Sequence, residues 1–379
     1  MKFVLTESQK QFRKEIKEFT RNYIAPLAIE IDETGRFPQE TIKKMAQSHL
    51  MGIPFPSEYG GSGKSYLDFV LAVEEISKAC ASTGVTLSTH TALCSWPVYA
   101  FGNNTQRESY LKPLTKGENL GAFCLTEPNA GTDAASIKTT AVLKEDYWIL
   151  NGKKYFVTNG GEADIYVVFA STHPKLRGKG ISSFIIEKGF DGFELGKIEK
   201  KMGIRGSMTR EIIFNNCKVP KSNLLGEENK GLSIAFSALN VGRIGIAAQA
   251  LGIAEGAFDK TVKYLKERKQ FEKHLSDFQG LQFEIADMYT KIEAVKMLVY
   301  KAAWTLDQGL NISSEAAVAK LIASEAAMSI TTKAVQLHGG YGYLQEHEVE
   351  RMMRDAKITE IYEGTSQVQK MIIASHVFK

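Results

Sequence analysis

Four segments of the chain combine glycine with hydroxyl, amide and acidic side chains more densely than a structural scaffold needs. They cover residues 123–133, 156–161, 336–342 and 361–367. In the last of them, Glu363 follows Ile361 and Tyr362 and precedes Gly364. This setting predicts a partly desolvated carboxylate on a tight turn, with a raised pKa. A carboxylate with a raised pKa is suited to removing a proton from a weak carbon acid.

Other motifs with catalytic associations do not fit. The Gly60–Ser65 stretch resembles a phosphate-binding loop, but Glu58 stands where that loop needs glycine. The glycines at 339, 340 and 342 do not follow a dinucleotide-binding pattern, and two glycines after a helix usually cap it. The seven histidines show no metal-ligand spacing, and no serine-hydrolase motif is present. We therefore expect no metal site, no nucleotide hydrolysis and no serine nucleophile.

The composition describes a folded, near-neutral protein. The 379 residues carry a net charge of +4 and are 44% hydrophobic, which excludes intrinsic disorder and a nucleic-acid-binding tail. The four cysteines lie far apart, and no stretch reaches the roughly 18 apolar residues of a membrane span. We expect a soluble protein of the reducing cytoplasm. The chain has 32 glycines but no glycine-rich flexible linker, so its high glycine content needs another explanation.

The elements that must position these segments fall into three zones. Residues 1–120 have helical periodicity, and Thr6 with Gln9 forms a capping box that predicts a helix start. Residues 121–228 contain short β-type runs: we predict strands at 165–170, 181–187, 192–197 and 210–214. We also predict a hairpin whose turn is Asn151-Gly152. This spacing favours a compact antiparallel sheet or a small barrel.

Residues 229–379 return to helix. The run from Leu232 to about Glu267 is apolar on most faces, which predicts a buried helix. Four glycines inside it imply that something approaches its backbone closely, either a neighbouring helix or a ligand. Further helices are predicted at about 276–306, 313–337 and 366–377. The predicted fold class is mainly α with a β insert.

Taken together, the four segments and the order of the zones resemble the acyl-CoA dehydrogenases, flavoproteins that desaturate acyl thioesters between the α and β carbons. The resemblance covers essentially the whole chain. It implies an N-terminal helical domain (1–120), a middle antiparallel β-barrel domain (121–228) and a C-terminal four-helix-bundle domain (229–379).

The resemblance also implies a set of FAD-binding residues. Arg268 and Phe271 correspond to an element that reaches a neighbouring subunit's cofactor, although Glu272 replaces the glycine that usually follows. Gln279 could equally belong to a capping box that begins at Ser276. Phe156 stands where medium-chain members usually carry tryptophan, which favours the short-chain, butyryl-CoA-type subgroup. The implied cofactor-binding residues are Phe123, Leu125, Thr126, Thr132, Phe156, Thr158, Arg268, Phe271, Gln279, Gln336, Gly339, Gly340, Thr365 and Gln367.

For the substrate, the resemblance implies contacts from Thr132, Asn240, Arg243 and Gly364. Asn240 replaces the usual aspartate. Glu363 is implied to be the catalytic base. In some family members the base lies instead on the long helix, at the position that is Gly242 here. This chain therefore has a glutamate at position 363 and no side chain at position 242.

The implied reaction converts a short-chain acyl-CoA to a trans-2-enoyl-CoA, as in fatty acid β-oxidation. Electron-transfer flavoprotein is the implied electron acceptor, and a homotetramer is the implied assembly. Three alternatives stay open: a medium- or branched-chain substrate, an oxidase or flavin monooxygenase on the same fold, and a non-enzymatic scaffold without FAD. Peroxide production in air would indicate the second, and a colourless protein the third.

Overall fold

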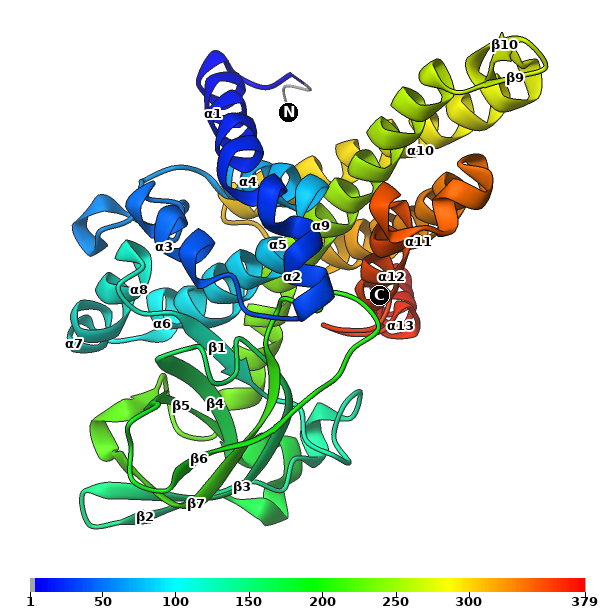
Figure 1. Cartoon of the computed structure of the whole chain (residues 1–379). Coiled ribbons are helices and arrows are strands. Elements are labelled where there is room, and N and C mark those ends of the chain that lie inside the picture. Colours follow the sequence, from blue (N-terminus) through cyan, green and yellow to red (C-terminus); the bar gives the residue numbers. More distant parts are fainter. Residues whose placement is uncertain (1–3, 379) are drawn as a thin grey trace.

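Helices, a curved sheet and a second group of longer helices follow one another along the chain (Figure 1). The computed structural model describes residues 4–378, so residues 1–3 and Lys379, the ends of the first and last predicted domains, lie outside the description. This order confirms the predicted fold class, mainly α with a β insert.

The first zone contains eight α-helices among the described residues. The predicted capping box is confirmed: the amide of Gln9 donates to Thr6 Oγ1 at 3.2 Å, and Gln9 Oε1 accepts from the amide of Thr6 at 3.0 Å. The helices are α1 (Glu7–Phe19), α2 (Ala28–Thr34), α3 (Gln39–Gln47), α4 (Tyr66–Ala79), α5 (Ala81–Ser88), α6 (Trp96–Phe101), α7 (Asn104–Gln106) and α8 (Lys112–Lys116).

The second zone is a curved sheet with the order β6-β7-β3-β2-β4-β5-β8, and β1 pairs with β4. All seven residues of β4 are buried, so this strand forms the centre of the zone's core. The strands are β1 (Gly121–Cys124), β2 (Thr140–Lys144), β3 (Tyr147–Thr158), β4 (Ile165–Ser171), β5 (Ile181–Glu187), β6 (Phe193–Ile198), β7 (Thr209–Pro220) and β8 (Leu224–Leu225).

Two features of the sheet differ from the predicted antiparallel barrel. Within residues 4–378, no pairing joins the edge strands β6 and β8, so the sheet curls without closing. Strand β8 has only two residues, which offer too few backbone groups for a closing ladder. In addition, β1 pairs with β4 in parallel, with Gly121 opposite Ile165. The prediction of strands in this zone was correct, whereas the prediction that they close into a barrel was wrong.

The predicted hairpin turn at Asn151-Gly152 was also wrong. Strand β3 runs unbroken through both residues, and the register against β7 shifts between Leu150 and Gly152. A Cβ at Gly152 would overlap the side chain and Cα of Thr139. Glycine inside a strand can mark a bulge or a close approach, and it does so here. The tight turn lies earlier, between β2 and β3, where Glu145 has φ 53°.

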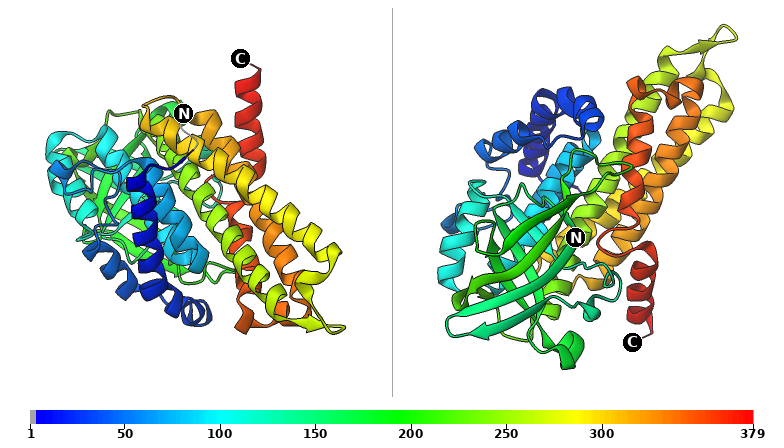
Figure 2. Two further views of the ribbon diagram at one scale, coloured as in Figure 1. Left: turned by 90° about the horizontal axis from the view of Figure 1, so that it is seen from above. Right: turned by 60° about the horizontal axis from the view of Figure 1, so that its bottom comes forward.

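The third zone is built around α9, which packs against α4 and α11 (Figure 2). The helices predicted at 313–337 and 366–377 have those bounds, and the one predicted from 276 begins at Gln279. The elements are α9 (Gly231–Glu267), β9 (Lys269–Gln270), β10 (Lys273–His274), α10 (Gln279–Asp307), α11 (Ser313–Leu337), α12 (Val349–Thr359) and α13 (Ser366–Val377).

Close packing of neighbouring helices explains one of the glycines of α9. A Cβ at Gly252 would overlap the carbonyl of Glu74 in α4, so the two helix backbones are in contact there. Of the described helices, α9 alone is long and apolar enough to cross a membrane by length and composition, yet 67% of its most apolar window is buried. It is the core helix of the protein, as the sequence predicted.

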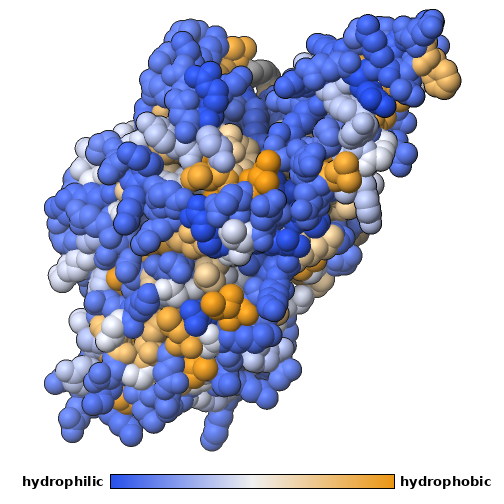
Figure 3. All heavy atoms as spheres, viewed as in Figure 1, coloured by the Kyte–Doolittle hydropathy of each residue, from blue (hydrophilic) through white to orange (hydrophobic). Residues whose placement is uncertain are grey.

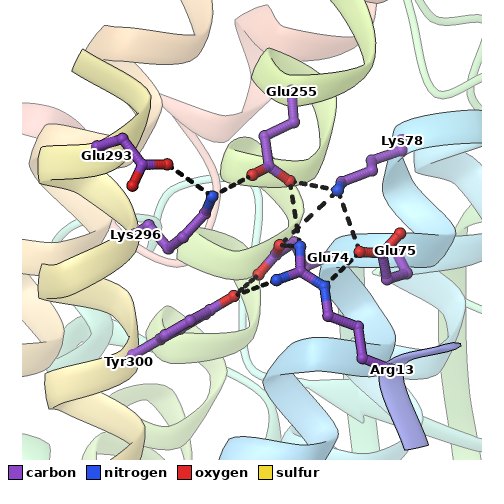
Figure 4. Close-up of polar contacts among 8 residues, drawn as sticks. All are labelled: Arg13, Glu74, Glu75, Lys78, Glu255, Glu293, Lys296 and Tyr300. Carbon is purple, nitrogen blue, oxygen red and sulfur yellow. Dashed lines mark hydrogen bonds and ion pairs between the residues drawn. The ribbon is translucent and has the colours of Figure 1, made fainter. Parts of the chain in front are cut away.

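An inter-helix charge cluster joins α1 and α4 to the long helices α9 and α10 (Figure 4). Arg13 pairs with Glu74 at 2.5 Å and with Glu75 at 2.6 Å. On the other side, Glu255 pairs with Lys78 at 2.6 Å and with Lys296 at 2.8 Å. The cluster comprises Arg13, Glu74, Glu75, Lys78, Glu255, Glu293, Lys296 and Tyr300.

Candidate active site

A cavity of about 670 Å³ lies where the sheet meets α9 and the segment that leads into α13. Figure 3 shows hydrophobic residues gathered over the sheet and near its junction with the helices, on the face of the molecule seen in Figure 1. Ten of the predicted site residues line the cavity. They are Phe123, Leu125, Thr126, Thr132, Phe156, Thr158, Arg243, Glu363, Gly364 and Thr365.

The lining residues suit an aromatic ring system with polar edges. Phe156 is 63% exposed and Met202 is 56% exposed although both border the cavity, so apolar surface is left to be covered. The hydroxyl-bearing residues Thr126 and Thr158 line the same space. An apolar wall with a few fixed donors is the environment that a flavin ring requires. These residues therefore fit an FAD isoalloxazine ring.

A buried ion pair holds the first of the four segments against the sheet. Lys154 of β3 is fully buried, and its Nζ lies 2.7 Å from Glu127 Oε1. Glu127 also accepts hydrogen bonds from the amides of Lys138 and Thr139, at 2.6 and 3.0 Å. These contacts, with a hydrogen bond from Lys154 Nζ to the carbonyl oxygen of Leu125 at 3.1 Å, tie the two ends of residues 125–139 to β3. Glu127 and Lys154 are thus structural supports for the Thr126 side of the cavity.

Glu363 lies on a strained turn at the edge of the cavity. Its φ is 53° and that of Gly364 is 95°, a conformation that a non-glycine residue adopts only when its surroundings enforce it. Its carboxylate oxygen Oε2 is buried and has no hydrogen-bond partner. Burial raises the pKa of Glu363 to about 7, against the opposing charges of Lys320 and Arg243. The carboxylate is thus poised near neutral pH and has an unused acceptor.

The Glu363 carboxylate occupies the space beside Gly242 of α9. A Cβ at Gly242 would overlap Glu363 Oε2 and come within 2.7 Å of Leu93 Cδ2. The two positions that the family resemblance offers for a base are therefore adjacent in space. In this chain only one of them can carry a side chain of any size.

Arg243 is 6% exposed and holds two groups in place. Its Nη1 donates to Asn240 Oδ1 at 2.7 Å, and its Nε donates to the carbonyl oxygen of Glu363 at 3.3 Å. Burial lowers the pKa of Arg243, while Glu363 opposes this change. Arg243 thus supports the turn that carries Glu363. Asn240 does not line the cavity.

Another group of predicted residues lies elsewhere in the chain, beyond the end of α11 and at the end of α9. Arg268, Gln336, Gly339 and Gly340 line a second cavity, also of about 670 Å³. Arg268 lies over the ring of Tyr341, 5.2 Å from its centroid. The β9–β10 hairpin beside it projects from the end of the long helices, away from the sheet (Figure 1). The single chain therefore separates the predicted cofactor-binding residues into two sites.

Four predicted residues line neither cavity. They are Asn240, Phe271, Gln279 and Gln367. Phe271 is 86% exposed at the tip of the hairpin. Gln279 is the first residue of α10, and the alternative capping box from Ser276 was wrong: Asp277 caps His274 instead. Gln367 is exposed in the first turn of α13.

Two residues that bind the backbone of the Glu363 turn were not predicted from the sequence. Lys320 and Gln369 are both fully buried, and both donate to the carbonyl oxygen of Gly364. A signal for Lys320 was available, because it is a lone cation in an otherwise apolar stretch of α11. Gln369 gave no such signal, since a glutamine in a short helix is usually exposed.

Comparison with known proteins gives the same assignment along the whole chain. Family models of the acyl-CoA dehydrogenase N-terminal, middle and C-terminal domains match residues 6–118, 122–217 and 229–378. A short-chain specific acyl-CoA dehydrogenase of Clostridium acetobutylicum is 55% identical, with both chains fully covered.

Two solved structures superimpose over the full length of both chains. One was described in a study of the electron transferring flavoprotein of Acidaminococcus fermentans, with a TM-score of 0.99 and 52% identity. The other is the butyryl-CoA dehydrogenase of Megasphaera elsdenii, with a TM-score of 0.99 and 48% identity. The protein thus belongs to the acyl-CoA dehydrogenase family and is an FAD-dependent oxidoreductase.

Proposed function

We propose that this protein dehydrogenates short-chain acyl-CoA thioesters to trans-2-enoyl-CoA, with Glu363 as the catalytic base. The observation that carries the proposal is the buried, unpartnered Oε2 of Glu363 at the edge of an apolar cavity. The relative named as short-chain specific and the butyryl-CoA dehydrogenase structure support the choice of substrate.

Each site residue has a defined task in this reaction. Glu363 Oε2 takes the α proton of the thioester, and its pKa of about 7 lets it accept that proton at neutral pH. Bound FAD supplies the acceptor for the hydride that leaves the β carbon. The apolar side chains of the cavity exclude water and align the acyl chain between base and cofactor. Arg243 keeps the carbonyl of Glu363, and so the turn, in place.

The test is an anaerobic titration of the purified protein, followed by the visible absorbance of its flavin. We expect faster bleaching with butyryl-CoA than with octanoyl-CoA. Glu363→Gln keeps the shape of the side chain but cannot take a proton, so this variant should retain FAD and lose the bleaching.

Glu325→Gln is the matched control, because Glu325 is a surface residue of α11 that pairs with Lys370. This control should bleach as the unmodified protein does. Undiminished bleaching in Glu363→Gln would show that another group is the base. Faster bleaching with octanoyl-CoA or a branched acyl-CoA would reassign the substrate, and peroxide formed in air would indicate an oxidase.

The remaining functional assignments are proposals from the same resemblance. We assign electron-transfer flavoprotein as the electron acceptor, which the similarity to the structure from the Acidaminococcus fermentans study supports. We assign a homotetramer, because part of the predicted FAD site lies on a hairpin remote from Glu363.

The buried, unpaired cysteines suit a cytoplasmic location. Thr365, the N-cap of α13, and Gln367 are assigned to the FAD phosphates or ribose, since a helix N-terminus favours anions.

A further inference from the structure

The turn that carries Glu363 is held by side chains from three different helices. Arg243 of α9 and Gln369 of α13 each donate to the carbonyl oxygen of Glu363 at 3.3 Å. Lys320 of α11 donates to the carbonyl oxygen of Gly364 at 2.7 Å, and Gln369 donates to the same oxygen at 2.8 Å. Two consecutive carbonyl groups thus receive four hydrogen bonds. This number exceeds what a surface turn needs and compensates the strain of the positive φ of Glu363, whereas Gly364 adopts its positive φ without strain.

We propose that Lys320 and Gln369 are positioning residues for the reaction: both fix the Glu363–Gly364 turn, and Lys320 also places a positive charge beside the turn that carries the Glu363 carboxylate. The proposal rests on the proposed role of Glu363 as the base.

The placement of Lys320 is costly unless its charge has a use. Its side chain is fully buried, and its one hydrogen-bond acceptor among the described residues is the carbonyl of Gly364. A buried ammonium group needs an opposite charge nearby, and Glu363 is the main anion that acts on it. A glutamine could have held the carbonyl without the cost of burying a charge. The lysine therefore supplies an electrostatic effect in addition to its hydrogen bond.

The charged and titratable groups around the carboxylate are few. Lys320 faces it from α11 and Arg243 from α9, and both lower the pKa that burial raises. Tyr362 and Glu360 belong to the same turn; the Tyr362 hydroxyl contacts Gln249, and Glu360 pairs with Lys357 at 2.7 Å. Gln369 contributes no charge. Of the described residues, Lys320 and Arg243 are the two cations that lower the pKa of Glu363, so removal of the Lys320 charge must raise that pKa.

The experiment measures proton removal alone. A 3-thia-acyl-CoA, in which sulfur replaces the β carbon, has no β hydride to lose, so exchange of its α protons for deuterium reports the base directly. The exchange rate is followed against pH in the full-length, FAD-loaded protein.

Three variants separate the charge from the hydrogen bonds. Lys320→Gln keeps a donor but loses the charge, and we expect the acid midpoint of its profile to move up by roughly one pH unit. Lys320→Met, which loses both, should show the same shift and a lower plateau. Gln369→Met loses only donors, so its plateau should fall while its midpoint stays. Lys370→Met, an exposed lysine of the same helix as Gln369, should match the unmodified protein.

Visible absorbance of bound FAD and thermal unfolding show which variants are folded and loaded. An unshifted midpoint in a folded Lys320→Gln protein would overturn the charge role of Lys320. An unchanged plateau in Gln369→Met would overturn the positioning role of Gln369. Undiminished exchange in Glu363→Gln would instead refute the proposed function, so the two failures are distinguishable.

Discussion

At the scale of single residues, the Glu363 carboxylate and the Cα of Gly242 occupy adjoining space. Gly242→Ala would place a methyl group on Glu363 Oε2 and against Leu93. Because α9 is fixed by its neighbours, the glutamate side chain must move away from the substrate. We expect at least a tenfold loss of the flavin reduction rate with FAD retained, roughly what a misplaced reacting group costs.

Gly189→Ala is the control for this substitution, since nothing lies within 4 Å of a Cβ at that position. It should leave the reduction rate unchanged. A Gly242→Ala protein as fast as the unmodified one would show that the carboxylate does not act from beside α9.

The raised pKa of Glu363 predicts the pH dependence of the reaction. The base must be ionised before it can accept a proton, so the rate is greatest above the pKa and falls as the pH drops through about 7. Well below that value the rate of anaerobic flavin reduction should fall about tenfold per pH unit. A rate that stays constant from pH 8 to pH 5 would contradict the burial of this carboxylate.

Residues with a chemical signature of their own could be predicted from the sequence, and those defined by their neighbours could not. Glu363, Thr126 and Phe156 stand in recognisable motifs, and they line one cavity. Gln369 became recognisable only when the fold brought α13 beneath the Gly364 carbonyl. Asn240 contacts Arg243 three residues further along α9, a spacing at which helical side chains meet, but the sequence does not reveal that this contact takes the place of a cavity contact.

At the scale of the elements, the inter-helix charge cluster connects the first zone to the long helices. Burial opposes the ionisation of Glu255, but the charges of Lys78 and Lys296 hold its pKa below that of an ordinary glutamate. Glu255→Gln would leave two lysines facing each other without their shared anion. We expect a loss of about 3 kcal/mol in the free energy of unfolding at neutral pH, measured by denaturant titration.

The pH dependence of this loss has a defined sign. Because the folded-state pKa of Glu255 is lowered, its stabilisation is present above the ordinary glutamate pKa and disappears as the pH falls through the lowered value. The difference between variant and unmodified protein should therefore shrink in acid. Glu7→Gln, at an exposed pair on α1, is the control and should leave the unfolding curve unchanged.

Elements with one strong local signal were predicted well. The bounds of α11 and α13 agree with the periodicity of the sequence, and α1 begins where its capping box indicates. The sheet was predicted less well, because Asn151-Gly152 has the composition of a turn, but Asn151 pairs with Thr140 of β2 and Gly152 with Phe214 of β7. Closure of the sheet depends on pairing between distant strands, which no local pattern encodes.

At the scale of the whole molecule, the predicted cofactor-binding residues lie in two separate cavities of one chain. A complete cofactor site could therefore combine residues of two chains. If Arg268 serves a neighbour's cofactor, then Glu363→Gln in one chain and Arg268→Ala in the other disrupt the same site of a mixed dimer. One site receives both defects, and the other is complete. Co-expressed in equal amounts, the two inactive variants should recover roughly one quarter of the unmodified activity with random pairing. No recovery would place Arg268 and Glu363 in the same chain's site.

Helix α9 passes beside Glu363 at Gly242, through the charge cluster at Glu255 and ends next to Arg268. At 1.5 Å per residue it separates Gly242 from Arg268 by about 39 Å. The number of residues in this part of α9 therefore sets the distance between the Glu363 cavity and the Arg268 cavity. One inserted residue in this interval would turn the Arg268 end by about 100° and lengthen it by about 1.5 Å. An insertion or deletion in this interval would therefore misalign the two cavities relative to each other.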